Sequence, residues 1–256
     1  MYAEERHREI LERLKLTGKV SVEQLADTLG VSAPTVRADL GMLEARKLLR
    51  RTHGGALALE STLYEPPYAE RERVRQLEKS RIARAAAARV RDHETVLLDA
   101  GTTTYEVAVC LKARIGLTVV TNSLEAAWEL MDAPPGHVEI IVVGGNVHAR
   151  RRAVLGPLAT DFLQNIQVDR AFLGINGVHP EAGWTVVDFD AAQVKRAMMA
   201  RAREVVVVAD AAKLGVAAFA SVAPLRAAHV LVTDTAPEHA LAEALAAANV
   251  EVVVAP

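Results

Sequence analysis

The chain has 256 residues, of which 51% are hydrophobic and 24% charged, and its formal net charge at pH 7 is −2. This length is sufficient for two domains, and the composition excludes a wholly disordered chain because a packed core can form. A single cysteine, Cys110, excludes an intrachain disulfide and a cysteine-based zinc cluster, and its apolar neighbours predict a buried core residue. No leader-like signal opens the chain and no apolar run of about 18 residues occurs. We therefore expect a cytoplasmic protein with no membrane association, no metal and no cofactor.

A helix is predicted over roughly residues 4–16, and two shorter helices joined by a tight turn follow within residues 20–39. Ser21 and Ser32 stand where N-cap residues are needed, and Gly30 stands where the first short helix has to end. Two capped helices at this spacing predict a helix-turn-helix, a motif that docks in the major groove of DNA.

The second of these short helices is predicted to have one buried and one exposed face. Val36, Leu40 and Leu43 recur at helical spacing, which indicates that they pack into a core. Thr35 and Arg37 then face outward near the start of the helix, where a recognition helix reaches base edges.

Residues 48–59 predict a short hairpin around T-H-G-G, that is, a wing. We interpret Gly54 and Gly55 as residues that supply backbone angles forbidden to other side chains. Judged by charge alone, the basic residues near the wing are more typical of a solvated helix face. The helix-turn-helix pattern beside them instead favours a surface that binds DNA. We therefore assign residues 1–58 to a winged helix-turn-helix domain. The candidate DNA-contacting residues are Ser32, Ala33, Thr35, Arg37, Arg46, Lys47, Arg50, Arg51, His53, Gly54 and Gly55.

The chain changes character after this domain. Residues 59–76 are polar and contain two adjacent prolines, which predicts a linker. Residues 77–256 begin with a helical pattern and continue with short β-branched runs separated by helical stretches. This pattern predicts an α/β domain whose parallel or mixed sheet is covered on both faces. The runs are T-V-L-L-D (95–99), L-T-V-V-T-N (117–122), V-E-I-I-V-V-G-G (138–145), V-D-R-A-F-L-G-I (168–175), E-V-V-V-V-A-D (204–210), H-V-L-V-T-D (229–234) and V-E-V-V-V-A (250–255).

The sequence L-L-D-A-G-T-T-T-Y ends the first of these strands and opens a helix. Gly101 lets the backbone approach a ligand, and Thr102, Thr103 and Thr104 offer hydroxyls beside the free N–H groups of the helix N-terminus. This arrangement is typical of a phosphate cradle, although an ordinary N-cap with spare threonines gives the same pattern. It is not a P-loop, because no Gly-Lys-Ser/Thr follows.

Other candidate residues follow strand ends or lie on the helices after them. Lysines in this group would serve the cradle if they converge on it, and each is equally compatible with an ordinary surface lysine. The arginine run at residues 150–152 follows the third strand and fits a solvated surface as well. The candidate residues are Asn122, Gly144, Gly145, Lys195 and Lys213.

Taken together, these motifs resemble the DeoR family of bacterial transcription regulators. The resemblance rests on H-G-G-A, D-A-G-T-T-T, T-N-S, V-V-G-G, L-G-P-L, D-R-A-F-L-G-I-N-G-V, G-W-T, V-K-R-A-M and A-D-A-A-K, which follow one another along nearly the whole chain. It implies an N-terminal winged helix-turn-helix and a C-terminal sensor domain similar to ribose-5-phosphate isomerase. It further implies a homodimer or homotetramer that binds double-stranded operator DNA and represses a carbohydrate or nucleoside catabolic operon until a phosphorylated sugar releases it. The effector-binding residues that the resemblance implies are Asp99, Gly101, Thr102, Thr103, Thr104, Asn122, Gly144, Gly145, Lys195 and Lys213.

The chain departs from the family pattern at a few positions. Ala38 stands where a second arginine is common, and Ala191 stands where a glutamate is common. Trp184 stands where a leucine is usual. The resemblance therefore leaves the operator sequence and the identity of the sugar open.

Other functions fit less well. A sugar-phosphate isomerase or transferase needs carboxylates around the sugar, and Asp99, Asp188, Asp190 and Asp210 are candidates. Such an enzyme has no use for a winged domain, so we expect no catalytic residues. A dinucleotide-dependent oxidoreductase is excluded because no G-x-G-x-x-G opens the first βα turn. Within the family, an activator remains the alternative to a repressor.

Overall fold

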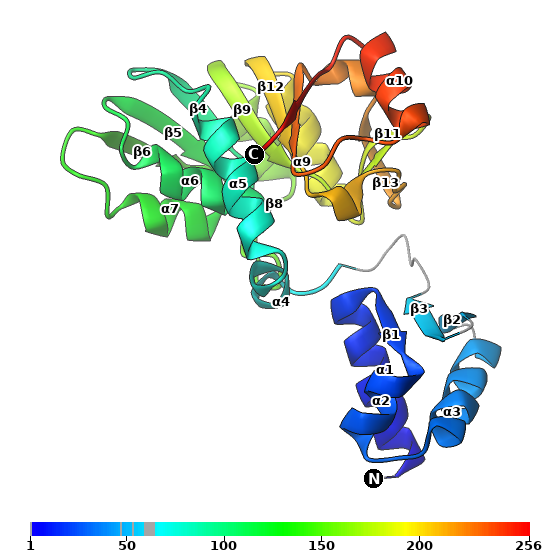
Figure 1. Ribbon diagram of the computed structural model, residues 1–256. Coiled ribbons are helices and arrows are strands. Elements are labelled where there is room, and N and C mark those ends of the chain that lie inside the picture. Colours follow the sequence, from blue (N-terminus) through cyan, green and yellow to red (C-terminus); the bar gives the residue numbers. More distant parts are fainter. Residues whose placement is uncertain (1, 47, 53, 59–64) are drawn as a thin grey trace. The chain divides into compact units, whose positions relative to one another are not determined.

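Figure 1 shows the computed structural model of the chain, which divides into two compact units. We call residues 1–66 the N-terminal unit and residues 67–256 the C-terminal unit, and each has its own hydrophobic core. Among the described residues, no helix is long and apolar enough to cross a lipid bilayer. The structure describes residues 2–46, 48–52, 54–58 and 65–256.

Helices and a small antiparallel sheet build the N-terminal unit. The hydroxyl of Ser21 accepts a hydrogen bond from the Gln24 N–H at 3.1 Å, and that of Ser32 accepts one from the Thr35 N–H at 3.4 Å. Both predicted N-caps are therefore confirmed. Gly30 ends the first short helix with a φ of 64°, the left-handed conformation expected of it. The elements are α1 (Ala3–Thr17), β1 (Lys19–Ser21), α2 (Val22–Leu29), α3 (Ala33–Ala45), β2 (Leu49–Thr52) and β3 (Gly55–Ala58).

A buried carboxylate on α3, that of Asp39, accompanies the predicted core residues Val36, Leu40 and Leu43. It accepts hydrogen bonds from Arg6 Nε at 2.8 Å and Nη2 at 3.1 Å. It also lies 3.0 Å from Nε2 of His7. Because Arg6 and His7 belong to α1, Asp39 holds α3 against α1.

The pKa of Asp39 reflects these contacts. Burial opposes ionisation, but the hydrogen bonds from Arg6 and His7 outweigh it and hold the pKa below its ordinary value of 3.8. A carboxyl with a depressed folded pKa stabilises the fold above its ordinary pKa, and that stabilisation is lost as the pH falls through the folded value.

Asp39→Asn is expected to lower the free energy of unfolding of the N-terminal unit by about 2 kcal/mol at pH 7, because hydrogen bonds to a charged acceptor are lost. The difference from wild type shrinks as the pH falls from 3.8 through the depressed folded pKa of Asp39, below which the native carboxyl is also neutral. Hydrogen exchange of the α1 and α3 amides in the full chain measures both effects. Asp27→Asn, a change at an exposed acid on α2, is the control and leaves exchange unchanged. Equal destabilisation by the two variants would contradict the assignment.

Strands β2 and β3 form the predicted wing, and β1 pairs with β3 to give the strand order β1-β3-β2. The reason predicted for Gly55 is wrong, since this residue has no positive φ. A Cβ at Gly55 would instead overlap the backbone carbonyl of Val20 in β1, whereas a Cβ at Gly54 would meet open space. Gly55 is therefore required by the close approach of β1 to β3.

A parallel sheet forms the centre of the C-terminal unit. Its strand order is β15-β14-β12-β9-β4-β5-β6, and every neighbouring pair in it is parallel. Each β-branched run of the sequence supplies one of these strands, so the predicted α/β class is confirmed. The strands are β4 (Thr95–Leu98), β5 (Leu117–Thr121), β6 (Val138–Val142), β9 (Val168–Gly174), β12 (Ala202–Val208), β14 (Val230–Thr233) and β15 (Glu251–Val254).

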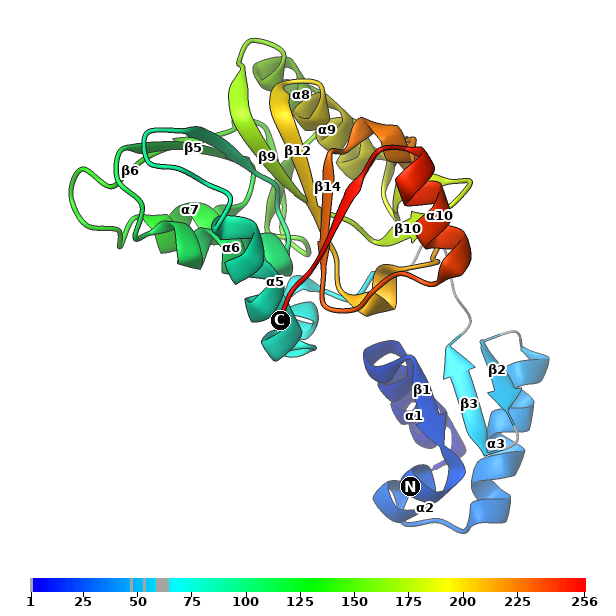
Figure 2. The ribbon, with the colours of Figure 1, turned by 45° about the horizontal axis from the view of Figure 1, so that its top comes forward.

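Helices cover both faces of this sheet (Figure 2). Leu98 and Phe172 belong to the core under α5, α6 and α7, whereas Leu97 and Leu173 belong to the core under α8, α9 and α10. Consecutive strand residues point to opposite faces, so a continuous apolar run fills both cores. The helices are α5 (Gln76–Ala87), α6 (Thr102–Leu111), α7 (Leu124–Leu130), α8 (Pro157–Leu163), α9 (Phe189–Met199) and α10 (His239–Ala247).

Short elements outside the sheet were not predicted from the sequence. The strand β7 pairs with β8, and β11 lies between β10 and β13, in both cases antiparallel. These strands have only three or four residues, which is too short for a periodic pattern. They are β7 (Asn146–His148), β8 (Ala153–Leu155), β10 (Gly177–His179), β11 (Gly183–Val186) and β13 (Ala220–Ala223), and two 3₁₀ turns are η1 (Ala211–Lys213) and η2 (Leu225–Ala227).

Part of the predicted linker is ordered and belongs to the C-terminal unit. Within residues 59–76, helix α4 (Tyr68–Arg73) places Tyr68 in a buried position, and residues 59–64 lie outside the described part of the chain. The guanidinium carbon of Arg152 lies 5.0 Å from the centre of the Tyr68 ring. A single tyrosine in a polar segment gives no periodicity, so the sequence alone did not predict this helix.

Candidate functional site

The exposed start of α3 carries the candidate base-reading residues. Arg37 and Ala38 are exposed and Thr35 is half-buried, on the side of the helix opposite its core residues. The hydroxyls of Ser32 and Thr35 lie 2.9 Å apart and hydrogen-bond to each other. Arg37 thus places an exposed cationic side chain near the start of α3, next to the turn that Ser32 caps.

The remaining candidate DNA contacts differ in exposure. Arg46, Arg51 and Gly54 are exposed, and the Arg51 N–H donates to the Glu44 carboxylate at 2.8 Å. Ala33 is half-buried, and Gly55 is buried under β1, which gives Gly55 a structural role. Lys47, His53 and the side chain of Arg50 lie outside the described residues.

In the C-terminal unit, the sheet changes direction at strand β4. From β4 the chain continues outward through β5 and β6 on one side and through β9, β12, β14 and β15 on the other. Ligands of open α/β sheets bind at the carboxyl ends of the strands at such a point. Asp99 follows β4 there, and its Oδ2 accepts a hydrogen bond from the Gly174 N–H at the end of β9, at 3.0 Å.

Asp99 and Lys195 form a buried ion pair at this point. Lys195 on α9 is 6% exposed, and its Nζ contacts Oδ2 of Asp99. Burial raises the pKa of the Asp99 carboxyl, while the Lys195 ammonium and the N–H groups of Ala100 and Gly174 act in the opposite direction. The structure thus brings together two of the sequence-predicted site residues that are far apart in the chain.

Helix α6 begins at Thr102, three residues after Asp99. The Thr104 hydroxyl donates to the Gly101 carbonyl at 3.0 Å and so serves the first turn of the helix. Among the described residues, the hydroxyls of Thr102 and Thr103 form no hydrogen bond, and the first N–H groups of a helix have no partner within it. Free donors at this terminus suit an anion.

Asn122 holds the loop between β4 and α6 in place. Its side chain is fully buried, its Oδ1 accepts from the Ala100 N–H at 2.8 Å, and its Nδ2 donates to the Val154 carbonyl at 3.1 Å. We assign Asn122 to positioning the loop, since its amide is used inside the protein.

The glycine pair and the arginine run near β6 have structural contacts. Gly145 has a φ of +147°, and a Cβ there would lie 3.2 Å from the Leu155 carbonyl oxygen of β8. Gly144 is exposed. Arg151 pairs with Asp188 at 2.9 Å, and Arg152 pairs with Glu125 at 2.8 Å. These contacts hold the β7–β8 hairpin, and the structure does not bring Gly144 or Gly145 into contact with Asp99 or Lys195.

Lys213 ends η1, directly after β12. The Asp210 carboxylate caps this turn by accepting from the Ala212 N–H at 2.9 Å. Lys213 is half-buried, and within the described part of the chain its ammonium forms no hydrogen bond or ion pair. Lys213 is thus a cation at the carboxyl edge of the sheet that no described residue pairs with.

The corner between α4 and α5 holds residues that the sequence interpretation missed. Arg75 has a left-handed φ of 55° and lies 3.4 Å from Asp210 and 2.8 Å from Asp234, which follow β12 and β14. Lys79, one turn along α5, is buried and recurs at helical spacing with Ile82. That spacing was the available signal, because a lysine on the apolar face of a helix is rarely buried without a reason.

The alternative enzyme reading has little support at this site. Asp188 caps α9 by accepting from the Ala191 N–H at 2.8 Å, and Asp190 is exposed. Asp99 is held by Lys195. The buried Trp184 donates to the Leu225 carbonyl at 3.0 Å and belongs to the core.

Comparison with protein families gives two matches that together span most of the chain. A family model described as the DeoR-like helix-turn-helix domain matches residues 6–62. A model described as the DeoR C terminal sensor domain matches residues 74–235.

Several curated proteins are similar over nearly their full length. The HTH-type transcriptional regulator GlpR of Haloferax volcanii is 37% identical over 254 residues, covering 99% of this chain and 98% of that protein. The HTH-type transcriptional repressor GlcR of Bacillus subtilis is 35% identical, with 99% and 97% covered. The glycerol-3-phosphate regulon repressor of Escherichia coli is 34% identical, with 91% of each chain covered. Among solved structures, ribose 5-phosphate isomerase A of Methanocaldococcus jannaschii aligns with a TM-score of 0.39 and 21% identity, over 53% of each chain.

Proposed function

We infer the function of this chain from the fact that it belongs to the DeoR family of transcriptional regulators. We propose that it is a cytoplasmic repressor that binds operator DNA through its N-terminal unit and leaves the operator when a phosphorylated sugar or polyol binds its C-terminal unit. The observation that carries the proposal is the exposed, capped start of α3 with Arg37, next to a wing, in a unit separate from the sheet.

The DNA-binding half of the proposal follows from the chemistry of that surface. Arg37, with Ser32 and Thr35, would read base edges, because a guanidinium donates two hydrogen bonds to guanine in the major groove. Arg46 and Arg51 would contact phosphates, which set register and affinity without reading sequence. Two copies in a homodimer would occupy half-sites about one helical turn apart.

The ligand half follows from the free donors at the carboxyl edge of the sheet. The N–H groups and hydroxyls at Thr102 and Thr103 would hold a phosphoryl group, and Lys213, which pairs with none of the described residues, would supply positive charge. Named relatives include a glycerol-3-phosphate regulon repressor, so three-carbon and larger sugar and polyol phosphates form the relevant chemical class. The ligand must bind the DNA-incompetent state more tightly, by about 1–3 kcal/mol for a typical coupling.

The experiment that tests this function uses the full chain and DNA from its own promoter region. Operator affinity is measured by fluorescence anisotropy with and without a panel of sugar and polyol phosphates. We expect tight binding to the promoter fragment, weaker binding to a scrambled one, and release by a subset of the panel. A protein that binds no promoter fragment in preference to the scrambled one refutes the proposal. A reporter gene whose transcription falls on deletion of the chain would indicate an activator.

Two single variants should separate the two halves. Arg37→Ala is expected to weaken operator binding by about tenfold or more and to reduce the preference over scrambled DNA, because a base contact worth about 1–3 kcal/mol is lost. Lys213→Ala is expected to keep the operator affinity and to need a much higher ligand concentration for release. If Arg37→Ala keeps both affinity and preference, or if Lys213→Ala is released at the wild-type concentration, the corresponding residue is not in its site.

A further inference from the structure

Lys79 is a buried cation that the proposed function does not use. It lies in the first turns of α5, is 6% exposed, and shares a face of the helix with the core residues Ile82, Ala83 and Ala86. An ammonium group loses most of its hydration there, and the burial of a charge is costly unless the charge is paired.

The partners of Lys79 do not balance this charge. Its Nζ donates to the backbone carbonyl of Arg71, in the last turn of α4. An ammonium has three donors, and among the described residues no other acceptor and no carboxylate lies within bonding distance of this one. Burial lowers the pKa of Lys79 to about 8, as expected for a cation without a counter-ion.

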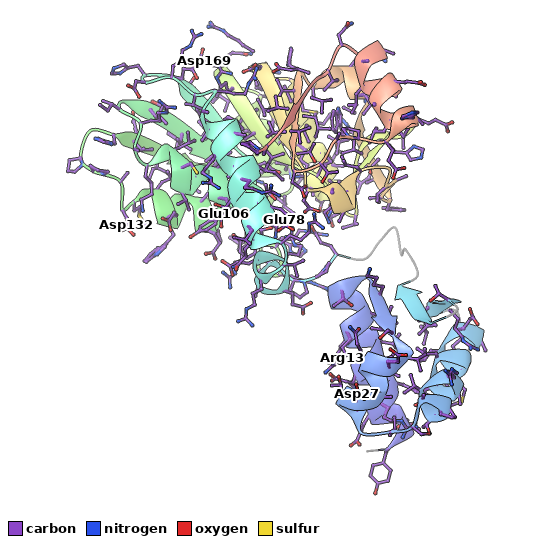
Figure 3. All side chains as sticks on the ribbon, in the orientation of Figure 1. Arg13, Asp27, Glu78, Glu106, Asp132 and Asp169 are labelled. Atoms are coloured by element: carbon purple, nitrogen blue, oxygen red, sulfur yellow. The ribbon has the colours of Figure 1, made fainter. Side chains whose placement is uncertain are left out.

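The surroundings of Lys79 belong to the carboxyl edge of the sheet. Arg75, the residue directly before α5, pairs with Asp210, which caps the η1 turn that carries Lys213. On the other side α5 packs against α6, whose Glu106 lies one turn after Thr102. Figure 3 labels Glu106 on α6 and Glu78 on the adjacent α5. The charges that act on Lys79 most strongly are those of Asp210, Arg71, Lys213 and Glu106.

We propose that Lys79 is a ligand of the phosphoryl group recognised by the C-terminal unit, and that binding this anion draws its ammonium away from the Arg71 carbonyl. This inference rests on the proposed function and adds a residue and a route of regulation to it. Lys79 and Lys213 would then contact the anion from α5 and η1, while the N-terminus of α6 faces it.

The second part of the proposal concerns α4. The Arg71 carbonyl is one of the last in α4, and it accepts from Lys79 Nζ and from the Val74 N–H, the latter at 3.3 Å. Withdrawal of Lys79 removes a charge-assisted contact from the C-terminal turn of this short helix. Because α4 is the first element after the N-terminal unit in the chain, a change in its stability reaches the segment that connects the two units.

The test compares full-length Lys79→Met and Lys79→Arg with wild type, using inorganic phosphate and glycerol 3-phosphate as probes. Lys79→Met keeps the length and apolar stem of the side chain and removes its charge. We expect Lys79→Met to bind either probe about tenfold or more weakly, since a charge-assisted hydrogen bond is lost. Because this variant lacks the contact with the Arg71 carbonyl even without ligand, its ligand-free operator affinity should fall below that of wild type. Lys79→Arg should recover most of the affinity. Arg84→Met, which removes an exposed cation of the same helix, is the control and leaves binding unchanged.

Two further measurements distinguish a ligand from a purely structural lysine. Calorimetric titrations at pH 8 in buffers of different ionisation enthalpy should show proton uptake on binding for wild type and none for Lys79→Met. The α4 amides should exchange faster with probe bound in wild type, and this change should be absent in Lys79→Met. If Lys79→Met binds the probes with wild-type affinity, the inference is wrong while the proposed function stands. If wild type binds its operator but neither probe changes its melting or its operator affinity, both fall.

Discussion

Lys195→Met is expected to lower the free energy of unfolding of the C-terminal unit by about 3–5 kcal/mol at pH 7, because it leaves the Asp99 carboxylate buried without its counter-ion. Asp99 is 2% exposed, and once the lysine is gone its carboxylate keeps, among the described residues, the hydrogen bond from the Gly174 N–H. The carboxylate stands at the end of β4, next to the turn that opens α6. We therefore also expect the variant to lose its response to phosphorylated ligands.

The loss depends on pH with a definite sign. Removing Lys195 removes an interaction that lowers the pKa of Asp99, so the pKa rises further above its ordinary value. A carboxyl whose folded pKa is raised favours the folded state below its ordinary pKa, and this advantage is lost as the pH rises through the folded value. Lys195→Met should therefore be closer to wild type at pH 5 than at pH 8.

The double variant Asp99→Asn with Lys195→Met tests the cause. It removes the unpaired charge and keeps an oxygen that accepts from Gly174, so it should recover part of the stability and lose the pH dependence. Guanidinium unfolding followed by tryptophan fluorescence measures all three proteins, because the fully buried Trp184 becomes exposed on unfolding whereas Trp128 is already exposed. A single variant as stable as wild type at pH 8 would show that Lys195 does not balance Asp99.

The pair also shows where sequence reasoning stops. The β-branched runs locate every strand of the parallel sheet, because strands buried on both faces are apolar throughout. The loops after the strands could thus be placed at one edge, and Asp99 and Lys195 were both named. The contact between Asp99 and Lys195 could not be predicted from the sequence. Asp99 follows strand β4 and Lys195 lies on helix α9, 96 residues later in the chain.

Other differences have equally local causes. Asn122 and Thr104 were named as ligand contacts from motif position, and that role stays a prediction. Their hydrogen bonds to backbone groups of the protein depend on packing, which motif position does not give. Tyr68 on α4 contacts Arg152, which lies far away in the sequence, and no periodic pattern predicts this contact. Lys79 was within reach, because its helical spacing with Ile82 placed a charge on an apolar face.

The second large expected effect is a loss of stability at a glycine of the wing. Gly55→Ala is expected to lower the free energy of unfolding of the N-terminal unit by about 3 kcal/mol, because the added Cβ overlaps the Val20 carbonyl and forces β1 away from β3. Small domains have little stability to spare, so this loss leaves a substantial fraction of the unit unfolded. Operator affinity should fall by about tenfold or more, while binding of phosphorylated ligands to the C-terminal unit stays at the wild-type level.

Gly54→Ala is the matched control for this effect. It adds the same methyl group one residue earlier on the wing, where the space is open, so operator affinity and stability should remain close to wild type. Hydrogen exchange of the β1 and β3 amides, read alongside anisotropy with operator DNA, links the loss of binding to the loss of strand pairing. Had the glycines been selected for turn conformation, the Gly54 variant would be the more damaging of the two. A Gly55→Ala protein with protected β1 amides and full operator affinity would contradict the close approach of these strands.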